Sequence, residues 1–185
     1  MRCQREIGFR RLRNADVSRI HAWLHRPHVA KWWYEDVGSY EKVFEQYSAY
    51  VEGKEPVEPY FILYRGRPVG YIQSYRVSDE EEFARLVGIE DSAGIDLFIG
   101  EEDLLYRGLG PGIVRCFLEK VVFTDKSIKA CIIDPEPGNG AAIRAYEKAG
   151  FRYLRTIEAP EGKAYLMWLS REEFGGAGFT VGPGS

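Results

Sequence analysis

The chain has 185 residues, of which 45% are hydrophobic and 29% charged, and its formal net charge is −3 at pH 7. This length predicts one domain, which we place at residues 1–175, followed by a flexible Gly-rich tail at 176–185. The small negative charge argues against nucleic acid as a partner, and the absence of an apolar run of roughly 18 residues argues against a membrane span. The N-terminal stretch lacks a secretion signal, and the three cysteines, Cys3, Cys116 and Cys131, are interpreted as reduced thiols. A cytoplasmic location is therefore expected.

The first half of the chain predicts two helices and an antiparallel hairpin. Apolar residues recur at helical spacing in two segments, and Pro27 ends the first of them. Two β-rich runs flank Arg65-Gly66, which is typical of a hairpin turn. In chain order we expect a strand at 7–12, a helix at 14–24, an aromatic loop at 29–36, a helix at 39–51 and the hairpin at 60–77.

The second half predicts alternating strands and helices. After an acidic loop we expect a strand at 93–99, a glycine loop, a helix at 112–123, a buried strand at 128–135, a helix at 139–150 and strands at 151–159 and 163–169. This order is typical of an α/β sheet with antiparallel hairpins early and a β-α-β unit in the middle. Ligands of such sheets bind at the carboxyl ends of the central strands.

The acidic loop and the glycine loop carry the strongest chemical signals. Ten acidic residues and one basic residue, Arg85, lie between Asp79 and Asp103. They form either a solvated loop or, as a group, a negative field that concentrates a cationic ligand. The segment Arg107–Gly112 (RGLGPG) leads into a helix, so its free backbone N–H groups and the helix N-terminus together suit an anion. A plain tight turn is equally compatible with the loop alone.

A second segment, taken together with this loop, carries a family resemblance. RGLG before a helix, with N-x-x-A-I-x-x-Y-x-K-x-G-F beginning at Asn139, resembles the GCN5-related N-acetyltransferase (GNAT) superfamily over Phe9 to Trp168. The resemblance implies an α+β fold with a mixed, mostly antiparallel central sheet and helices on both faces. It also implies acetyl-CoA as co-substrate, with its pyrophosphate on the glycine loop, and no metal. The implied acetyl-CoA contacts are Phe98, Ile99, Arg107, Gly108, Leu109, Gly110, Gly112, Asn139 and Ala142.

Five collinear stretches narrow the resemblance. WLHRPHVAKWW, PVGYIQSY, GIDLFIGE, DPEPGNGAAIRAYEKAGF and APEGKAYLM are similar, in this order, to aminoglycoside 6′-N-acetyltransferases, which acetylate a primary amine of a polycationic aminosugar. The resemblance implies that Asp96 is the general base and Tyr146 the general acid. Leu97 departs from the Gln often found after that Asp and is expected to alter contacts beside the amine. The implied substrate contacts are Trp33, Gln73, Tyr75, Asp79, Asp96, Asp134 and Glu161.

Elementary chemistry favours the same two roles. A primary amine is mostly protonated at pH 7, so a carboxylate at the reacting end of a strand is needed to accept its proton. A phenol near the CoA sulfur protonates the leaving thiolate, and a backbone N–H near Phe98 stabilises the developing oxyanion. His21 and His25 have the spacing of a helical zinc pair, but the Glu of H-E-x-x-H is missing, so no metal is expected.

Other functions remain open at this point. The same reaction on another small cationic amine, on a siderophore amine or on a protein N-terminus would use the same residues. A non-catalytic acyl-CoA-binding module is a further alternative, although the presence of both Asp96 and Tyr146 argues against it. The partner is expected to be a small cationic amine, with no nucleic acid and no membrane, and the protein is expected to be a monomer or a homodimer.

Overall fold

The computed structural model describes residues 5–33, 38–159 and 162–176. Glu161, Cys3 and the predicted tail beyond Gly176 lie outside the described residues. The described strands form one seven-stranded sheet in the order β1-β2-β3-β4-β5-β7-β6. The strands are β1 (Ile7–Arg11), β2 (Val57–Tyr64), β3 (Arg67–Arg76), β4 (Ser92–Ile99), β5 (Ala130–Ile133), β6 (Arg152–Ala159) and β7 (Gly162–Ser170).

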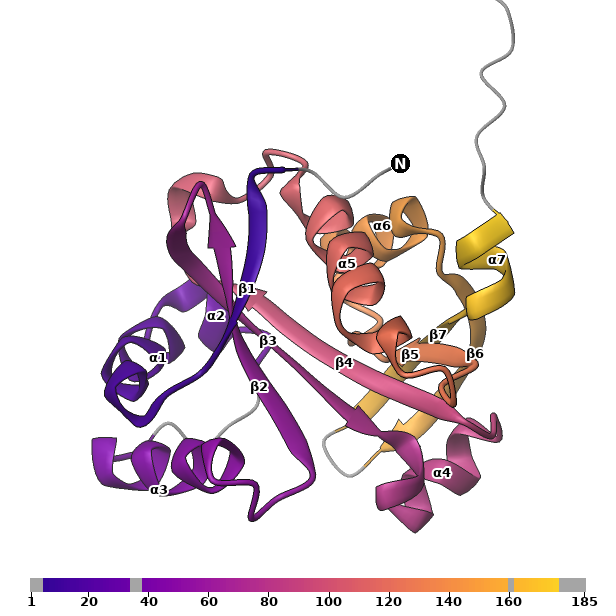
Figure 1. Ribbon diagram of the computed structural model, residues 1–185, viewed down its shortest axis with the longest axis horizontal. Coiled ribbons are helices and arrows are strands. Elements are labelled where there is room, and N and C mark those ends of the chain that lie inside the picture. The colour runs from indigo at the N-terminus through magenta and orange to yellow at the C-terminus, as the bar shows by residue number, and fades with distance from the viewer. Residues whose placement is uncertain (1–4, 34–37, 160–161, 177–185) are drawn as a thin grey trace, which may run out of the picture.

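Helices cover both faces of this sheet (Figure 1). Alternation along β2 shows why: Ile62 joins a core cluster with Phe117, whereas the adjacent Phe61 joins a second cluster with Trp23 on the opposite face. The first face carries α5 (Leu109–Lys120) and α6 (Gly140–Ala149), and the second carries α1 (Val17–Leu24), α2 (Pro27–Ala30) and α3 (Tyr40–Val51). The expected mixed, mostly antiparallel sheet with helices on both faces is confirmed.

One strand pair in the middle of the sheet is parallel and short. β4 and β5 pair only through Ser92–Gly94 and Ala130–Ile132. Beyond Gly94, β4 continues to Ile99 with a ladder to β3 alone. The sheet therefore opens between β4 and β5 at their carboxyl ends, which is where a ligand site is expected in a sheet with this parallel step.

Three short helices lie where the sequence predicted none. The predicted acidic loop contains α4 (Glu81–Val87), which ends at Gly88 in the left-handed conformation and buries Val87. Pro27 begins α2 as well as following α1, because proline suits the first turn of a helix. The chain also forms α7 (Arg171–Gly176) directly after β7.

The cysteines differ from expectation at one position. Cys131 is a free, buried thiol of β5, as expected. Cys116, on α5, is disulfide-bonded, so the prediction of reduced thiols is wrong for this residue. Within the described ranges, we find no helix with both the length and the apolarity that crossing a membrane requires.

Candidate active site

The opening between β4 and β5 leads into a large cleft. Its walls come from β3, β4, the segment after β5, α2, α3, α4, the first turn of α5, one side of α6 and the start of β7. Its volume of about 2440 Å³ exceeds the roughly 300–1,000 Å³ of a pocket for one small ligand. The cleft therefore has room for two substrates side by side.

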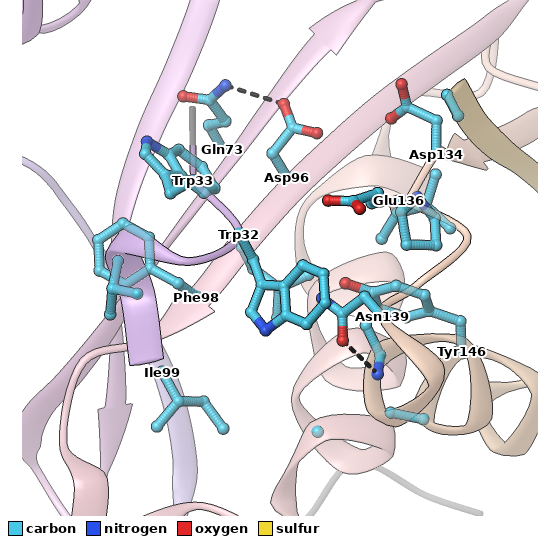
Figure 2. Close-up of a pocket in the computed structure, with 18 of the residues that line it drawn as sticks. Trp32, Trp33, Gln73, Asp96, Phe98, Ile99, Asp134, Glu136, Asn139 and Tyr146 are labelled. Atoms are coloured by element: carbon cyan, nitrogen blue, oxygen red, sulfur yellow. Dashed lines mark hydrogen bonds between the residues drawn. The ribbon is translucent and has the colours of Figure 1, made fainter. Parts of the chain in front are cut away.

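Asp96 lies on β4 just beyond the point where the parallel pairing ends. It is the cross-strand partner of Gln73 on β3, whose Nε2 donates to Asp96 Oδ2 at 2.9 Å (Figure 2). Burial raises the pKa of Asp96 from 3.8 to about 6, and the hydrogen bond from Gln73 opposes that rise. A carboxylate with a pKa near 6 is ionised at neutral pH and still basic enough to accept a proton.

Tyr146 enters the cleft from α6. Its side chain is 8% exposed, and it lines the same cleft as Asp96 (Figure 2). Burial, and then the negative charges of Asp96 and Asp134, raise the pKa of Tyr146 far above its usual value. The phenol is therefore protonated at all ordinary pH values and is suited to donate a proton rather than to accept one.

The glycine loop provides a helix N-terminus at the cleft. Gly108 is the N-cap of α5 with φ of 74°, and a Cβ at this position would meet nothing within 4 Å. Gly108, Leu109, Gly110 and Gly112 line the cleft, whereas Arg107 is exposed and is not among the lining residues. Gly110 packs against α6, where an added Cβ would lie 3.3 Å from Ala145 Cβ. The loop has the open N–H groups that an anion requires.

The predicted acetyl-CoA residues on α6 and β4 line the cleft in different ways. Asn139 is the N-cap of α6, and its Oδ1 accepts a hydrogen bond from Ala142 N at 3.2 Å. Phe98 turns its ring into the aromatic core, 4.9 Å from Trp33 between ring centroids. Ile99 is half-buried, and its carbonyl oxygen lies 3.0 Å from His28 Nε2. Both Phe98 and Ile99 line the cleft, although the Phe98 ring packs largely in the core and its backbone pairs with Tyr71 of β3.

The predicted substrate residues converge on the same cleft from three elements. Gln73 and Tyr75 come from β3, Asp79 from the turn after β3, and Asp134 from the end of β5. The Tyr75 ring lies directly on the backbone of its cross-strand partner Gly94, where a Cβ would approach within 2.3 Å of the ring. Glu161 lies outside the described residues, so its predicted contact stays a prediction.

Two neighbouring tryptophans from the segment after α2, Trp32 and Trp33, make different contacts. Trp33, the predicted substrate residue, makes edge-to-face contacts with Phe98 and Tyr71, and its buried Nε1 has no hydrogen-bond partner within the described part of the chain. Trp32 extends across the cleft to the loop before α6, where a Cβ at Gly138 would lie 3.7 Å from Trp32 Cη2 (Figure 2). Trp32 thus joins the two walls of the cleft, which its sequence position did not reveal.

The negative charge in the cleft is more local than the sequence suggested. Of the ten acidic residues between Asp79 and Asp103, four line the cleft: Asp79, Glu80, Glu82 and Asp96. Glu101 instead accepts hydrogen bonds from Trp23 and Arg26. The segment after β5 adds Asp134 and Glu136, and basic side chains, among them Lys31, Arg76, Arg144 and Lys163, also line the cleft. The cleft therefore has acidic and basic groups in its lining.

Comparison with known proteins agrees with this geometry. The family model described as "Acetyltransferase (GNAT) domain" matches residues 13–159. The chain belongs to the GNAT family. It is 35% identical over 176 residues to aminoglycoside N(6′)-acetyltransferase type 1 of Klebsiella pneumoniae, a match that covers 91% of this chain and 85% of the relative.

Two further relatives show the range of this GNAT group. A solved structure of AAC(6′)-Ib with paromomycin and acetyl-CoA superposes with a TM-score of 0.84 at 31% identity, covering 95% of this chain and 99% of that one. The lysine N-acyltransferase MbtK of Mycobacterium sp. (strain MCS) is 26% identical over 158 residues, which cover 85% of this chain and 64% of the relative. The expected kinship to aminoglycoside 6′-N-acetyltransferases is confirmed.

One expectation for this GNAT domain concerns Leu97, and it stays a prediction. Leu97 alternates with Asp96 on β4, packs in part against the core cluster under α5, and also lines the cleft. Asp96 lies on the other face of the strand, next to Gln73.

Four side chains of the site were missed from the sequence. Trp32, Glu136 and His28 line the cleft, and Tyr71 hydrogen-bonds Gln73 at 2.7 Å. Tyr71 alternates with Gln73 and Tyr75 along β3, so the period of a strand could have placed all three on one face. Nothing in the sequence around Trp32, Glu136 or His28 indicates that loops far apart in the chain meet at the cleft.

Proposed function

We propose that this chain transfers the acetyl group of acetyl-CoA to a primary amine, the 6′-amine, of an aminoglycoside. One observation carries the proposal: a carboxylate with a pKa near 6 lines the same cleft as a protonated phenol, where β4 separates from β5 in a GNAT domain. The name of the 35% identical relative and the aminoglycoside-bound structural neighbours support this class of acceptor.

The residues of the cleft suit the proton transfers of this reaction. Asp96 accepts one proton from the substrate ammonium, so that the neutral amine attacks the acetyl carbon and a C–N bond forms. Tyr146 donates its proton to the CoA sulfur as the C–S bond breaks, and it regains a proton from the nitrogen that has become an amide. The sum is one amide, one thiol and one proton released to solvent through Asp96.

Charged groups of the cleft suit the two substrates. Acetyl-CoA is an anion, and the α5 N-terminus at Gly108 supplies N–H groups for it, while Arg144 in the cleft lining and the exposed Arg107 beside the loop supply positive charge. The acidic lining residues Asp79, Glu80, Glu82, Asp134 and Glu136 attract a polycationic acceptor. A neutral or anionic acceptor would gain nothing from them.

A thiol-release assay tests the proposal. The purified chain is supplied with acetyl-CoA and, in separate reactions, with aminoglycosides, polyamines, lysine-type amines and peptides that have a free N-terminus. We expect kcat/KM to be highest for aminoglycosides that carry a 6′-amine. Turnover confined to polyamines, lysine-type amines or peptides would replace the aminoglycoside with that class of acceptor.

Two further properties are proposed with this function. We place the reaction in the cytoplasm, where acetyl-CoA is made, and fractionation of the producing cells tests this location. We expect a monomer or a homodimer, and light scattering of the purified chain distinguishes the two.

A further inference from the structure

A line of three polar side chains crosses the sheet behind the proposed base. Tyr71 and Gln73 alternate along β3 onto one face, and Gln73 lies opposite Asp96 on β4. The hydroxyl of Tyr71 donates to Gln73 Oε1 at 2.7 Å, and Gln73 Nε2 donates to Asp96 Oδ2 at 2.9 Å (Figure 2). The outer member of this line does not line the cleft and has no role in the reaction as described so far.

The ring of Tyr71 is held firmly in place. The side chain is 0% exposed, and its ring lies 5.3 Å from Tyr47, 5.6 Å from Phe98 and 5.9 Å from Trp33 between centroids. Aromatic packing of this kind leaves a buried phenol little freedom to change its direction. The hydroxyl therefore presents its proton to Gln73 from a position that the core fixes in advance.

The direction of the first hydrogen bond determines the second. A Gln amide has one oxygen, which accepts, and one nitrogen, which donates. When the oxygen of Gln73 receives the Tyr71 proton, the nitrogen is left to face Asp96 as a donor. This donor stabilises the ionised carboxylate and not the neutral acid. Donation into the amide oxygen also polarises the amide and strengthens its N–H group as a donor.

We infer that Tyr71 is a positioning residue for the reaction: through Gln73 it keeps the carboxylate of Asp96 ionised and oriented toward the amine. The inference rests on the proposed role of Asp96 as base. Without the Tyr71 hydroxyl, the amide of Gln73 is free to turn and to accept a proton from a neutral Asp96 instead. The line of hydrogen bonds therefore selects one of two protonation states of the base.

Three of the groups that interact with Asp96 do not exchange protons in the pH range in which it titrates. Tyr75 from β3, Tyr146 from α6 and Cys131 from β5 interact electrostatically with Asp96, and burial raises the pKa of each far above the range in which Asp96 titrates. Two further carboxylates at the end of β5, Asp134 and Glu136, line the same cleft. Removing the neutral hydroxyl of Tyr71 leaves all these groups in place, so a change in the pKa of Asp96 in that variant comes from the lost hydrogen bond.

The test compares Tyr71→Phe with a matched control. Tyr60→Phe removes another sheet hydroxyl that donates to a residue two positions away, Glu58, at 3.2 Å, and the Tyr60 ring packs in the core of the opposite face. The titration of Asp96 is followed by the ¹³C chemical shift of its side-chain carboxyl in the free enzyme. The Asp96→Asn variant assigns the signal, and thermal unfolding shows that each variant is folded.

We expect Tyr71→Phe to raise the pKa of Asp96 by about 0.5–1 unit, and Tyr60→Phe to leave it unchanged. The acid limb of the profile of kcat/KM against pH shifts by the same amount. At pH values below the pKa of Asp96, kcat/KM therefore falls about 3–10-fold, and at pH values well above it kcat/KM approaches that of the wild type. In a Gln73→Leu background, Tyr71→Phe produces no further shift, because the connection to Asp96 is already lost.

Three results would overturn the inference. The first is an unchanged Asp96 titration in folded Tyr71→Phe, and the second is the same shift in the Gln73→Leu background. The third is a loss of activity that is equal at every pH, which would mean a purely structural role. The NMR titration needs no acceptor substrate, so it tests the effect of Tyr71 on Asp96 independently of the reaction. If the proposed function is wrong, the wild type shows no turnover of aminoglycosides, whatever the result of the titration.

Discussion

Replacing the proposed base should stabilise the protein while it abolishes most of the activity. Burial raises the pKa of Asp96 from 3.8 to about 6, which means that folding must take an ionised carboxylate out of water at neutral pH. A rise of about two units corresponds to about 3 kcal/mol of stability lost at pH values above the folded-state pKa. Asp96→Asn keeps the shape, removes the charge and can still accept the hydrogen bond from Gln73 through its Oδ1.

The sign of this effect depends on pH. Below pH 4 the carboxyl of Asp96 is protonated in both the folded and the unfolded chain, so the charge costs nothing there. The penalty grows between pH 4 and 6 and is complete above pH 6, because only the unfolded chain then holds the charge in water. Asp96→Asn should therefore unfold at a temperature up to roughly 6–12 °C above the wild type at pH 8, at roughly 2–4 °C per kcal/mol.

Calorimetry of both proteins at pH 4 and pH 8, with a thiol-release assay alongside, measures the two effects. We expect the difference in Tm to shrink toward zero at pH 4 and kcat to fall by about 10²–10⁴-fold, as for the loss of a general base. A variant that is less stable than the wild type at pH 8, or a Tm difference independent of pH, would refute the reasoning. Full activity of Asp96→Asn would refute the assignment of the base.

Three other substitutions test separate parts of the site. Tyr146→Phe should lower kcat by about 10²-fold or more with little change in acetyl-CoA affinity by calorimetry, whereas an unchanged kcat would remove Tyr146 from the mechanism. Gly108→Ala places a Cβ in the left-handed region at φ of 74° and should raise the KM for acetyl-CoA about 5–30-fold, and an unaltered KM would contradict a phosphate cradle there. Gly94→Ala drives a Cβ to 2.3 Å from the Tyr75 ring, so it should cost about 1–3 kcal/mol in a denaturant titration and be rescued by Tyr75→Ala.

Much of the fold followed from local patterns in the sequence. The helix predicted at 39–51 forms over Tyr40–Val51, and the hairpin turn forms at Arg65–Gly66, because each pattern reports which face of an element is buried. The helix α4 was not predicted, because its first turn is acidic. Its buried residue, Val87, packs against strands that are far away in the sequence. Acidic residues suit the first turn of a helix as well as they suit a loop.

The arrangement of the site depended on contacts that no local pattern contains. Asp96 and Tyr146 were identified by resemblance, but the separation of β4 from β5 after Gly94, which exposes Asp96 to the cleft, is a property of strand pairing. The reach of Trp32 to the loop before α6 is likewise a contact between distant segments. A sequence shows which residues alternate along one strand, and the register between strands is needed to show that Gln73 meets Asp96.

The position of the acetyl group on the product tests the central claim most directly. The purified chain is given acetyl-CoA and a matched pair of aminoglycosides that differ only in a 6′-amine or a 6′-hydroxyl, and the products are analysed by NMR. The account predicts one product, acetylated at the 6′-nitrogen, from the first compound and no turnover of the second. Acetylation of another amine, or equal turnover of both compounds, would contradict it.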